Sequence, residues 1–302
     1  KATSRPSDPI FNNTKKITIS DMKHIFSLIV FAFAITAHAQ QQAEIEVIYT
    51  EYQPNMRTGQ KDGTSHQYIL LARGDYSKFF SPRTEYLDSL NSTPEGKSKY
   101  QEMARSAYLG GKIEDVPRAD GSYYVVRSAT DNKLYYYDKV GTERFCYEED
   151  IPQLNWAVSD STKTILGYEC FLASADYHGR KWIVWFSPEI PVAAGPWKLQ
   201  GVPGLILEAS TEDGLYRFVA DGIQQTEKLI SPIYLANEYE KTDRVKFLKA
   251  KRVFMDNPVG AINAQFSGSG VSIRSVKLSG DSDSGSNIFI SRETVDFIET
   301  DY

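Results

Sequence analysis

The sequence is poor in the residues that build metal and redox sites. It has two cysteines and four histidines among 302 residues. A protein metal site needs several such ligands close together, and His66 and His178 are each isolated, so we assign them structural or surface roles. The Gly-x-Ser-x-Gly elbow, His-Glu-x-x-His, the P-loop and the Rossmann glycine pattern are missing too. We therefore predict no metal, no cofactor and no catalytic residue.

An excess of basic residues is also missing. Lys and Arg number 34 against 39 Asp and Glu, which gives a net charge of −5. Nucleic-acid binding requires a concentrated positive face, so nucleic acid is excluded as a main partner. With 41% hydrophobic and 13% aromatic residues, the chain has enough apolar material for a folded core.

Long hydrophobic runs are absent except for one near the N-terminus. A short basic start at residues 22–24 precedes an apolar stretch at 25–36 and a small-x-small pattern, Ala37-His38-Ala39. The stretch is shorter than the roughly 20 residues of a membrane-spanning helix. We predict a signal peptide over residues 22–39, cleaved between Ala39 and Gln40, and interpret residues 1–21 as non-native upstream sequence. The mature chain would be periplasmic or secreted and would have no transmembrane anchor.

The predicted export gives the two cysteines a possible role. Disulfides persist outside the cytoplasm, so Cys146 and Cys170 are candidates for a bridge that closes a loop of about 25 residues. Two separately buried thiols are the alternative.

Strand patterns dominate the mature chain. Ile45, Val47 and Tyr49 alternate with polar or acidic neighbours, as in a half-buried strand. Residues 164–173 alternate in the same way and are expected to form a single strand. Residues 181–187 are apolar on both faces, which predicts a central strand covered on both sides.

Two stretches follow a helical period. Apolar residues recur at three-to-four spacing in an insertion around 84–108 and again around 242–255. The predicted fold is mainly β (α+β), a curved antiparallel sheet or open half-barrel with these helices. We expect one β-rich domain over residues 40–256 and a Gly/Ser-rich, partly flexible segment over 257–302.

A specific string of motifs lies between residues 155 and 206. It holds all four tryptophans and ends in Gly201-Val-Pro-Gly-Leu-Ile206. This string resembles the GLPGLI family of exported Bacteroidota proteins, with Val202 in place of Leu. The resemblance implies an exported, predominantly β protein and supplies no catalytic residue. The residues that form this possible interaction corner are Trp182, Trp185, Pro188, Pro191, Gly195, Pro196, Trp197, Gly201, Pro203, Gly204, Leu205 and Ile206.

The turn residues of the motif allow two interpretations. Gly195-Pro196 and Pro203-Gly204 combine a rigid with a permissive residue and are typical of a structural corner. Turns held by a rigid sheet also carry binding sites. We expect a non-enzymatic binding or envelope accessory protein whose partner is an envelope protein or a small apolar ligand. The alternatives are a carrier of an apolar or lipid-like ligand in an open half-barrel and, less favoured, a hydrolytic enzyme.

Overall fold

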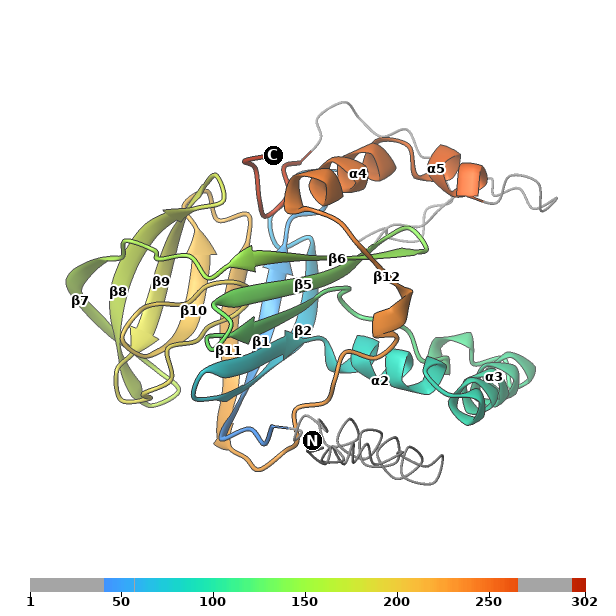
Figure 1. Ribbon diagram of the computed structural model, residues 1–302, viewed down its shortest axis with the longest axis horizontal. Coiled ribbons are helices and arrows are strands. Elements are labelled where there is room, and N and C mark those ends of the chain that lie inside the picture. The colour runs from blue at the N-terminus through green and yellow to red at the C-terminus, as the bar shows by residue number, and fades with distance from the viewer. Residues whose placement is uncertain (1–40, 57, 266–294) are drawn as a thin grey trace, which may run out of the picture. The chain divides into compact units, whose positions relative to one another are not determined.

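The computed structural model of the protein describes residues 41–56, 58–265 and 295–302, which belong to one compact unit, Gln41–Tyr302. Twelve strands of these residues form one open sheet, so the mainly β class is confirmed (Figure 1). Along the sheet their order is β12-β6-β5-β4-β3-β2-β1-β11-β10-β9-β8-β7. The strands are β1 (Ile45–Gln53), β2 (Thr64–Arg73), β3 (Tyr76–Phe80), β4 (Tyr124–Ser128), β5 (Lys133–Val140), β6 (Glu143–Asp150), β7 (Ala157–Ile165), β8 (Tyr168–Tyr177), β9 (Arg180–Ser187), β10 (Leu205–Thr211), β11 (Arg217–Gln225) and β12 (Tyr239–Lys241).

The sheet is mixed, although antiparallel pairing was expected throughout. β12 runs parallel to β6, with Tyr239 opposite Arg144 and Lys241 opposite Cys146, and every other neighbouring pair is antiparallel. Parallel pairing requires a long connection, whereas a hairpin produces an antiparallel pair. β12 follows β11 only after such a connection, which brings it back to the far edge of the sheet.

Alternating side chains divide the sheet into an inner and an outer face. We call inner the face that carries Tyr49, Tyr68, Phe79, Tyr136 and Tyr147, all of which belong to the main core. A smaller cluster on the outer face includes Leu71, Phe80 and Tyr124. The sequence alternation of β1 and β5 therefore corresponds directly to burial.

The strand predicted over residues 164–173 is interrupted, so that prediction is wrong. The chain turns at Leu166-Gly167, both with positive φ (52° and 87°), and β7 pairs with β8 as a hairpin. Two consecutive residues with positive φ suit a tight hairpin turn, and glycine adopts this conformation without steric cost.

β9 is covered on one face only. Its inward residues Trp182, Val184 and Phe186 are buried, whereas Ile183 and Trp185 on the other face are half-buried. Covering on both sides was expected. The helices of the described residues mainly contact β2, β5 and β6, so none of them shields the outer face of β9.

Both expected helical regions are confirmed. The insertion forms α2 (Pro82–Asn91) and α3 (Pro94–Leu109), and the later region forms α4 (Arg244–Asp256), followed by α5 (Pro258–Gln265). Thr93 and Asp243 cap α3 and α4 by accepting hydrogen bonds from the Gly96 and Lys246 amides. Short 3₁₀ turns lie at Ile113–Asp115 and Ala236–Glu238.

The helices cover different faces of the sheet (Figure 1). α4 packs Phe247 and Leu248 into the main core on the inner face. α2 lies on the outer face, where Tyr124 donates a hydrogen bond to the Asp88 carboxylate at 2.7 Å. Residues 295–302, which we call the C-terminal tail, pack on the inner side and bury Phe297.

Both cysteines are free, so the expected disulfide is absent. Cys170 belongs to the main core, together with Tyr147 of β6. Cys146 precedes Tyr147 on the same strand and therefore points to the opposite face. Cys170 lies on β8, which eight other strands separate from β6 in the sheet, so the two thiols do not meet.

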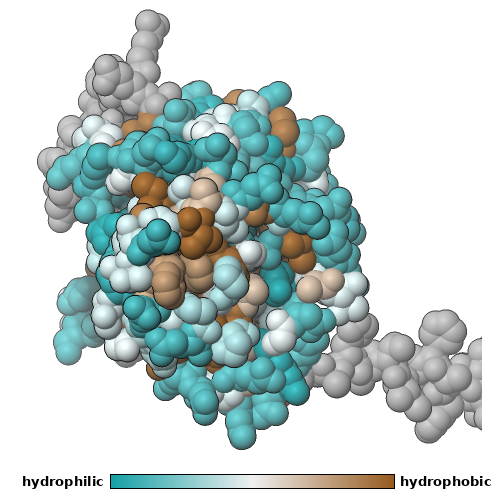
Figure 2. Space-filling model, turned by 90° about the vertical axis from the view of Figure 1, so that its left-hand side faces the viewer, coloured by the Kyte–Doolittle hydropathy of each residue, from teal (hydrophilic) through white to brown (hydrophobic). Residues whose placement is uncertain are grey.

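The free edge of the sheet at β7 carries an exposed hydrophobic patch. Figure 2 faces this end of the molecule and shows hydrophobic side chains surrounded by hydrophilic ones. Val158 on β7 is 56% exposed, and Leu166 in the following turn is 45% exposed. A bulge between Val158 and Thr162 interrupts the pairing of β7 with β8, and bulges discourage the addition of a further strand at an edge.

Several predictions concern parts of the chain outside the described residues. The upstream sequence at 1–21, the signal peptide at 22–39 and residues 266–294 of the Gly/Ser-rich segment fall there. Across the described residues, no helix combines the length and hydrophobicity that crossing a membrane requires.

Candidate functional site

A cavity of about 380 Å³ lies on the inner face, enclosed by the sheet, α4 and the C-terminal tail. Small-molecule sites commonly start at about this size. β1 and β2 contribute one wall, α4 contributes Phe247 and Lys251, and the tail contributes Phe297 and Glu299. We refer to this cavity as the pocket. Its aromatic lining consists of Tyr68, Tyr123, Tyr136, Tyr216, Phe247 and Phe297.

Stacked rings form the aromatic wall of the pocket. Tyr68 stacks on Phe79 and on Tyr123, with ring centroids 4.8 and 4.7 Å apart. Tyr136 continues the row, at 5.6 Å from Tyr123 and 4.9 Å from Tyr147. Because each ring covers its neighbour's face, the edges and hydroxyl groups remain for other contacts. The Tyr68 hydroxyl is buried and has no hydrogen-bond partner in the described part of the chain.

Glu51 belongs to the floor of the pocket. It follows Val47 and Tyr49 at alternate positions of β1, so its carboxylate lies on the buried inner face with an exposure of 0%. Tyr123 donates a hydrogen bond to Oε1 at 2.9 Å, and Oε2 has no hydrogen-bond partner among the described residues. Burial raises the pKa of Glu51 to about 6, although the charge of His66, hydrogen bonds with Gln53 and Tyr123, and the charge of Lys251 oppose this increase.

His66 faces Glu51 from the neighbouring strand. The two residues are directly opposite in the β1–β2 register. Nδ1 of His66 lies 2.7 Å from Oδ1 of Asp120, and the other carboxylate oxygen of Asp120 accepts a hydrogen bond from the Gln67 amide. These contacts attach the segment before β4 to β2 at the pocket. His66 therefore has a polar partner and a place in the lining that its isolation in the sequence did not indicate.

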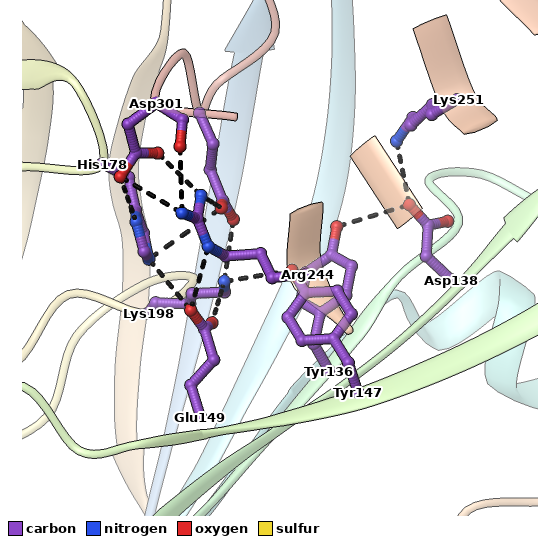
Figure 3. Close-up of polar contacts among 10 residues, drawn as sticks. Tyr136, Asp138, Tyr147, Glu149, His178, Lys198, Arg244, Lys251 and Asp301 are labelled. Carbon is purple, nitrogen blue, oxygen red and sulfur yellow. Dashed lines mark hydrogen bonds and ion pairs between the residues drawn. The ribbon is translucent and has the colours of Figure 1, made fainter. Parts of the chain in front are cut away.

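Beside the pocket lies an ionic cluster built around Lys198 (Figure 3). The Lys198 side chain is completely buried, and its ammonium group contacts the carboxylates of Glu149 and Glu299, the latter at 2.7 Å. It also donates a hydrogen bond to the Tyr147 hydroxyl at 3.1 Å. Glu299 lines the pocket as well, so the cluster fixes part of the pocket wall.

Arg244 and His178 extend this ionic cluster. Arg244 of α4 contacts Glu299 at 2.9 Å and Asp301 at 2.6 Å. His178, in the turn between β8 and β9, lies 3.4 Å from Glu149 through Nε2 and 3.3 Å from Asp301 through Nδ1. The cluster therefore joins five separate parts of the chain: β6, the β8–β9 turn, the segment that carries Lys198, α4 and the tail.

The pKa values of the acids reflect these contacts. Burial alone would raise the pKa of Glu149, but its hydrogen bond with His178 and the charge of Lys198 outweigh burial and lower the pKa to about 2. In Asp301, the hydrogen bonds with Arg244 and His178 likewise outweigh burial and lower the pKa. Both acids therefore remain ionised at neutral pH, as structural ion pairs require.

The cluster also contains a group with the composition of a metal site. Ligand atoms of His178, Glu299 and Asp301 lie within 4.8 Å of one another. Arg244 and Lys198 already contact these carboxylates and supply positive charge where a cation would bind. We therefore interpret the group as a structural ion network.

The motif that the sequence singled out fills the space above the inner face. Residues 194–200, which include Gly195, Pro196 and Trp197, are all buried, and Trp197 packs on Trp182 with ring centroids 5.4 Å apart. The side chain of Lys198, which belongs to this segment, extends into the ionic cluster. Gly204 has a φ of +151°, and a Cβ there would collide with the Ser187 carbonyl oxygen, so only glycine fits.

The other motif residues divide between core and surface. Leu205 and Ile206 are buried in β10, and the Ile206 carbonyl accepts a hydrogen bond from Tyr49 at 2.6 Å. Trp185 is half-buried, with the Lys163 ammonium 4.4 Å from its ring centroid. The exposed members, on the outside of the corner, are Pro188, Pro191, Gly201 and Pro203.

Sequence reasoning missed the residues that make the pocket polar. Glu51, Asp120 and Glu299 belong to no recognisable motif. One signal was available, because Glu51 occupies a core position in the alternation that starts at Ile45, and a charged residue at such a position often marks a functional site. Asp120 and Glu299 lie outside regular elements, where no periodicity places them.

Comparisons with known proteins found matches to parts of this chain. No curated protein matches the chain. Two solved structures with the titles "Structure of PNGF-II in P21 space group" and "Structure of PNGF-II in C2 space group" are each 15% identical, with TM-scores of 0.46 and 0.45. Each match covers 70% of this chain, which spans 33% of the other. Residues 178–208, from His178 through the motif corner into β10, match the model of a family described as "Protein of unknown function (Porph_ging)".

Proposed function

We propose that this chain is an exported, non-enzymatic binding protein of the GLPGLI type that holds a small ligand in the pocket. One observation carries the proposal: a cavity of about 380 Å³ with aromatic walls contains buried polar atoms, Glu51 Oε2 and the Tyr68 hydroxyl, that the described protein leaves without partners. Buried polar groups without partners are costly and uncommon. A bound ligand would satisfy them.

The size of the pocket favours a compact ligand over a long-chain lipid. The space between the sheet and the motif segment is filled by buried side chains such as Trp182, Trp197 and Leu199. A lipid carrier in an open half-barrel would need a longer open interior than the pocket provides. We therefore prefer a small, partly apolar ligand to the lipid-like cargo.

Native purification tests the binding function. The protein isolated from its own cell envelope should release a small molecule, recovered chemically unchanged, that native mass spectrometry detects. Ala119→Trp, at the exposed rim of the pocket, should abolish this ligand, whereas Val158→Trp on the distant edge strand should retain it. A wild-type protein that is consistently empty, or equal loading of both variants, would contradict the proposal.

The export proposal rests on the sequence pattern at residues 22–39. It predicts that the protein recovered from the periplasm or medium begins at Gln40. N-terminal sequencing of the recovered protein checks this, and a product found only in the cytoplasm with residues 22–39 intact would refute it.

A further inference from the structure

Glu51 differs from the other charged residues of the pocket because it has no ionic partner. Across the described ranges, the charged residues that line the pocket besides Glu51 are each paired. Those pairs are His66 with Asp120 at 2.7 Å, Lys251 with Asp138 at 2.9 Å, and Glu299 with Lys198 and Arg244 at 2.7 and 2.9 Å.

These pairs leave no surplus positive charge near Glu51. His66 with Asp120 is neutral or negative, depending on the protonation of the imidazole. Lys251 is balanced by Asp138, which is itself fully buried. Lys198, Arg244 and His178 face three carboxylates, those of Glu149, Glu299 and Asp301. Glu51 therefore carries the charge of the lining that no ion pair in the described ranges compensates, and a cationic group would compensate it.

The hydrogen-bonding groups of the pocket also favour a cationic ligand. Glu51 Oε2 is an acceptor without a donor, and Tyr123 already occupies Oε1. An ammonium group offers several N–H donors to one carboxylate, and a charge-assisted hydrogen bond is stronger than a neutral one. The aromatic walls would contact the apolar body of such a molecule.

From this geometry and charge balance we propose that the pocket binds a compact organic amine, whose ammonium group pairs with Glu51 and whose apolar part packs against the Tyr and Phe side chains. The proposal rests on the ligand-binding function proposed above and specifies its chemical class.

The proposal implies that affinity depends on pH. The pKa of Glu51 is raised to about 6 by burial, so the carboxylate is mostly ionised at pH 7.5 and mostly protonated at pH 5. The titratable and charged groups that line the pocket with it are His66 and Tyr68 on β2, Asp120 and Tyr123 before β4, Tyr136 on β5, Tyr216 just before β11, Lys251 on α4 and Glu299 on the tail. A ligand that requires the ionised carboxylate should bind about tenfold more weakly at pH 5 than at pH 7.5.

Calorimetric titration with two matched probes tests the chemical class. 2-Phenylethylamine carries the ammonium group, and 2-phenylethanol has a similar shape without the charge. The amine should bind the wild-type chain at least tenfold more tightly than the alcohol at pH 7.5. Glu51→Gln should remove this preference and its pH dependence while leaving alcohol binding within about twofold, because the pocket shape is kept. The control Glu44→Gln, at an exposed acid just before β1, should behave like the wild type.

Two results would overturn the amine proposal. One is equal affinity for both probes, and the other is an amine preference that survives Glu51→Gln. If neither probe binds, the amine proposal also fails. Native purification then decides the ligand-binding function separately, since a neutral molecule recovered from the wild type and lost in Ala119→Trp would support that function without the amine.

Discussion

The ionic cluster and the pocket floor show two opposite ways of burying a carboxylate within one core. Glu149 lies against Lys198 and His178, and its pKa falls to about 2. Glu51 accepts a hydrogen bond from the Tyr123 hydroxyl but has no ion pair among the described residues, and burial raises its pKa to about 6. Glu299, which contacts Lys198 and lines the pocket, connects the two regions.

Glu149 and Glu51 differ in whether a buried carboxylate has an ionic partner within the protein. Removing one member of a buried ion pair is strongly destabilising, because the other member is left charged and unpaired. A lone buried carboxylate instead costs stability in the folded protein, and such a cost is typical of functional sites. The difference supports a structural role for Glu149 and the proposed role of Glu51 in ligand binding.

The largest expected effect follows from removing the centre of the cluster. Lys198→Met leaves Glu149 and Glu299 buried beside each other with only Arg244 and His178 nearby, so the free energy of unfolding should fall by about 3–5 kcal/mol. Urea denaturation measures the change. Lys246→Met, whose side chain is 79% exposed, is the matched control and should shift it by less than about 0.5 kcal/mol. Similar values for the two variants would mean that the cluster is not a structural element.

Acid should weaken the cluster next. The pKa of Glu149 is lower in the folded chain, at about 2, than its ordinary value of 4.5, so its ionised form stabilises the fold above about pH 4.5. This contribution, on the order of 3 kcal/mol, is lost as the pH falls from about 4.5 to 2. In that range the free energy of unfolding of the wild type should fall more steeply with acidification than that of Glu149→Gln. The difference in slope should correspond to the uptake of close to one additional proton on unfolding. If the stabilities of the two proteins change with pH in parallel, the ionised form of Glu149 does not stabilise the fold.

A smaller change of opposite sign is expected at Glu51. Its pKa is raised in the folded chain, so burial of the charge lowers stability above about pH 6, and this penalty disappears as the pH falls from 6 to 4.5. Glu51→Gln should therefore stabilise the unliganded protein by about 2 kcal/mol at pH 7.5 and have little effect at pH 4.5. Thermal denaturation at both pH values measures this, and a destabilised variant at pH 7.5 would place Glu51 with the structural charges.

Regular patterns in the sequence predicted the framework of the fold. The alternation of β1 and the helical spacing of α4 arise from burial on one face, which a local window of sequence records directly. The same spacing predicted α3, although none of its residues is buried. The hairpin at Leu166-Gly167 was missed because Leu166 fits the alternation of its neighbours, and only its positive φ reveals the turn. The disulfide was wrong for a related reason, since spacing in the sequence does not report how far apart β6 and β8, which carry the two cysteines, lie in the order of the sheet.

The site could not be predicted from the sequence because distant segments assemble it. The motif residues were found, yet most of them turned out to pack the core, and Lys198 acts through Glu149 and Glu299 from two other parts of the chain. Pairing across such separations depends on the three-dimensional course of the sheet. Glu51 was the exception, since its position on the buried side of a strand could be recognised from the sequence.

The way the C-terminal tail closes the inner face has a consequence for how the chain folds. Lys198 pairs with Glu299 across 101 positions of sequence, and the Arg180 side chain donates hydrogen bonds to the Phe297 carbonyl across 117. Tyr49 reaches Ile206 across 157. Contacts this distant in sequence require large loops to close before they stabilise anything, and folding slows as their share grows. We expect folding in milliseconds to seconds, with seating of the tail as a late step.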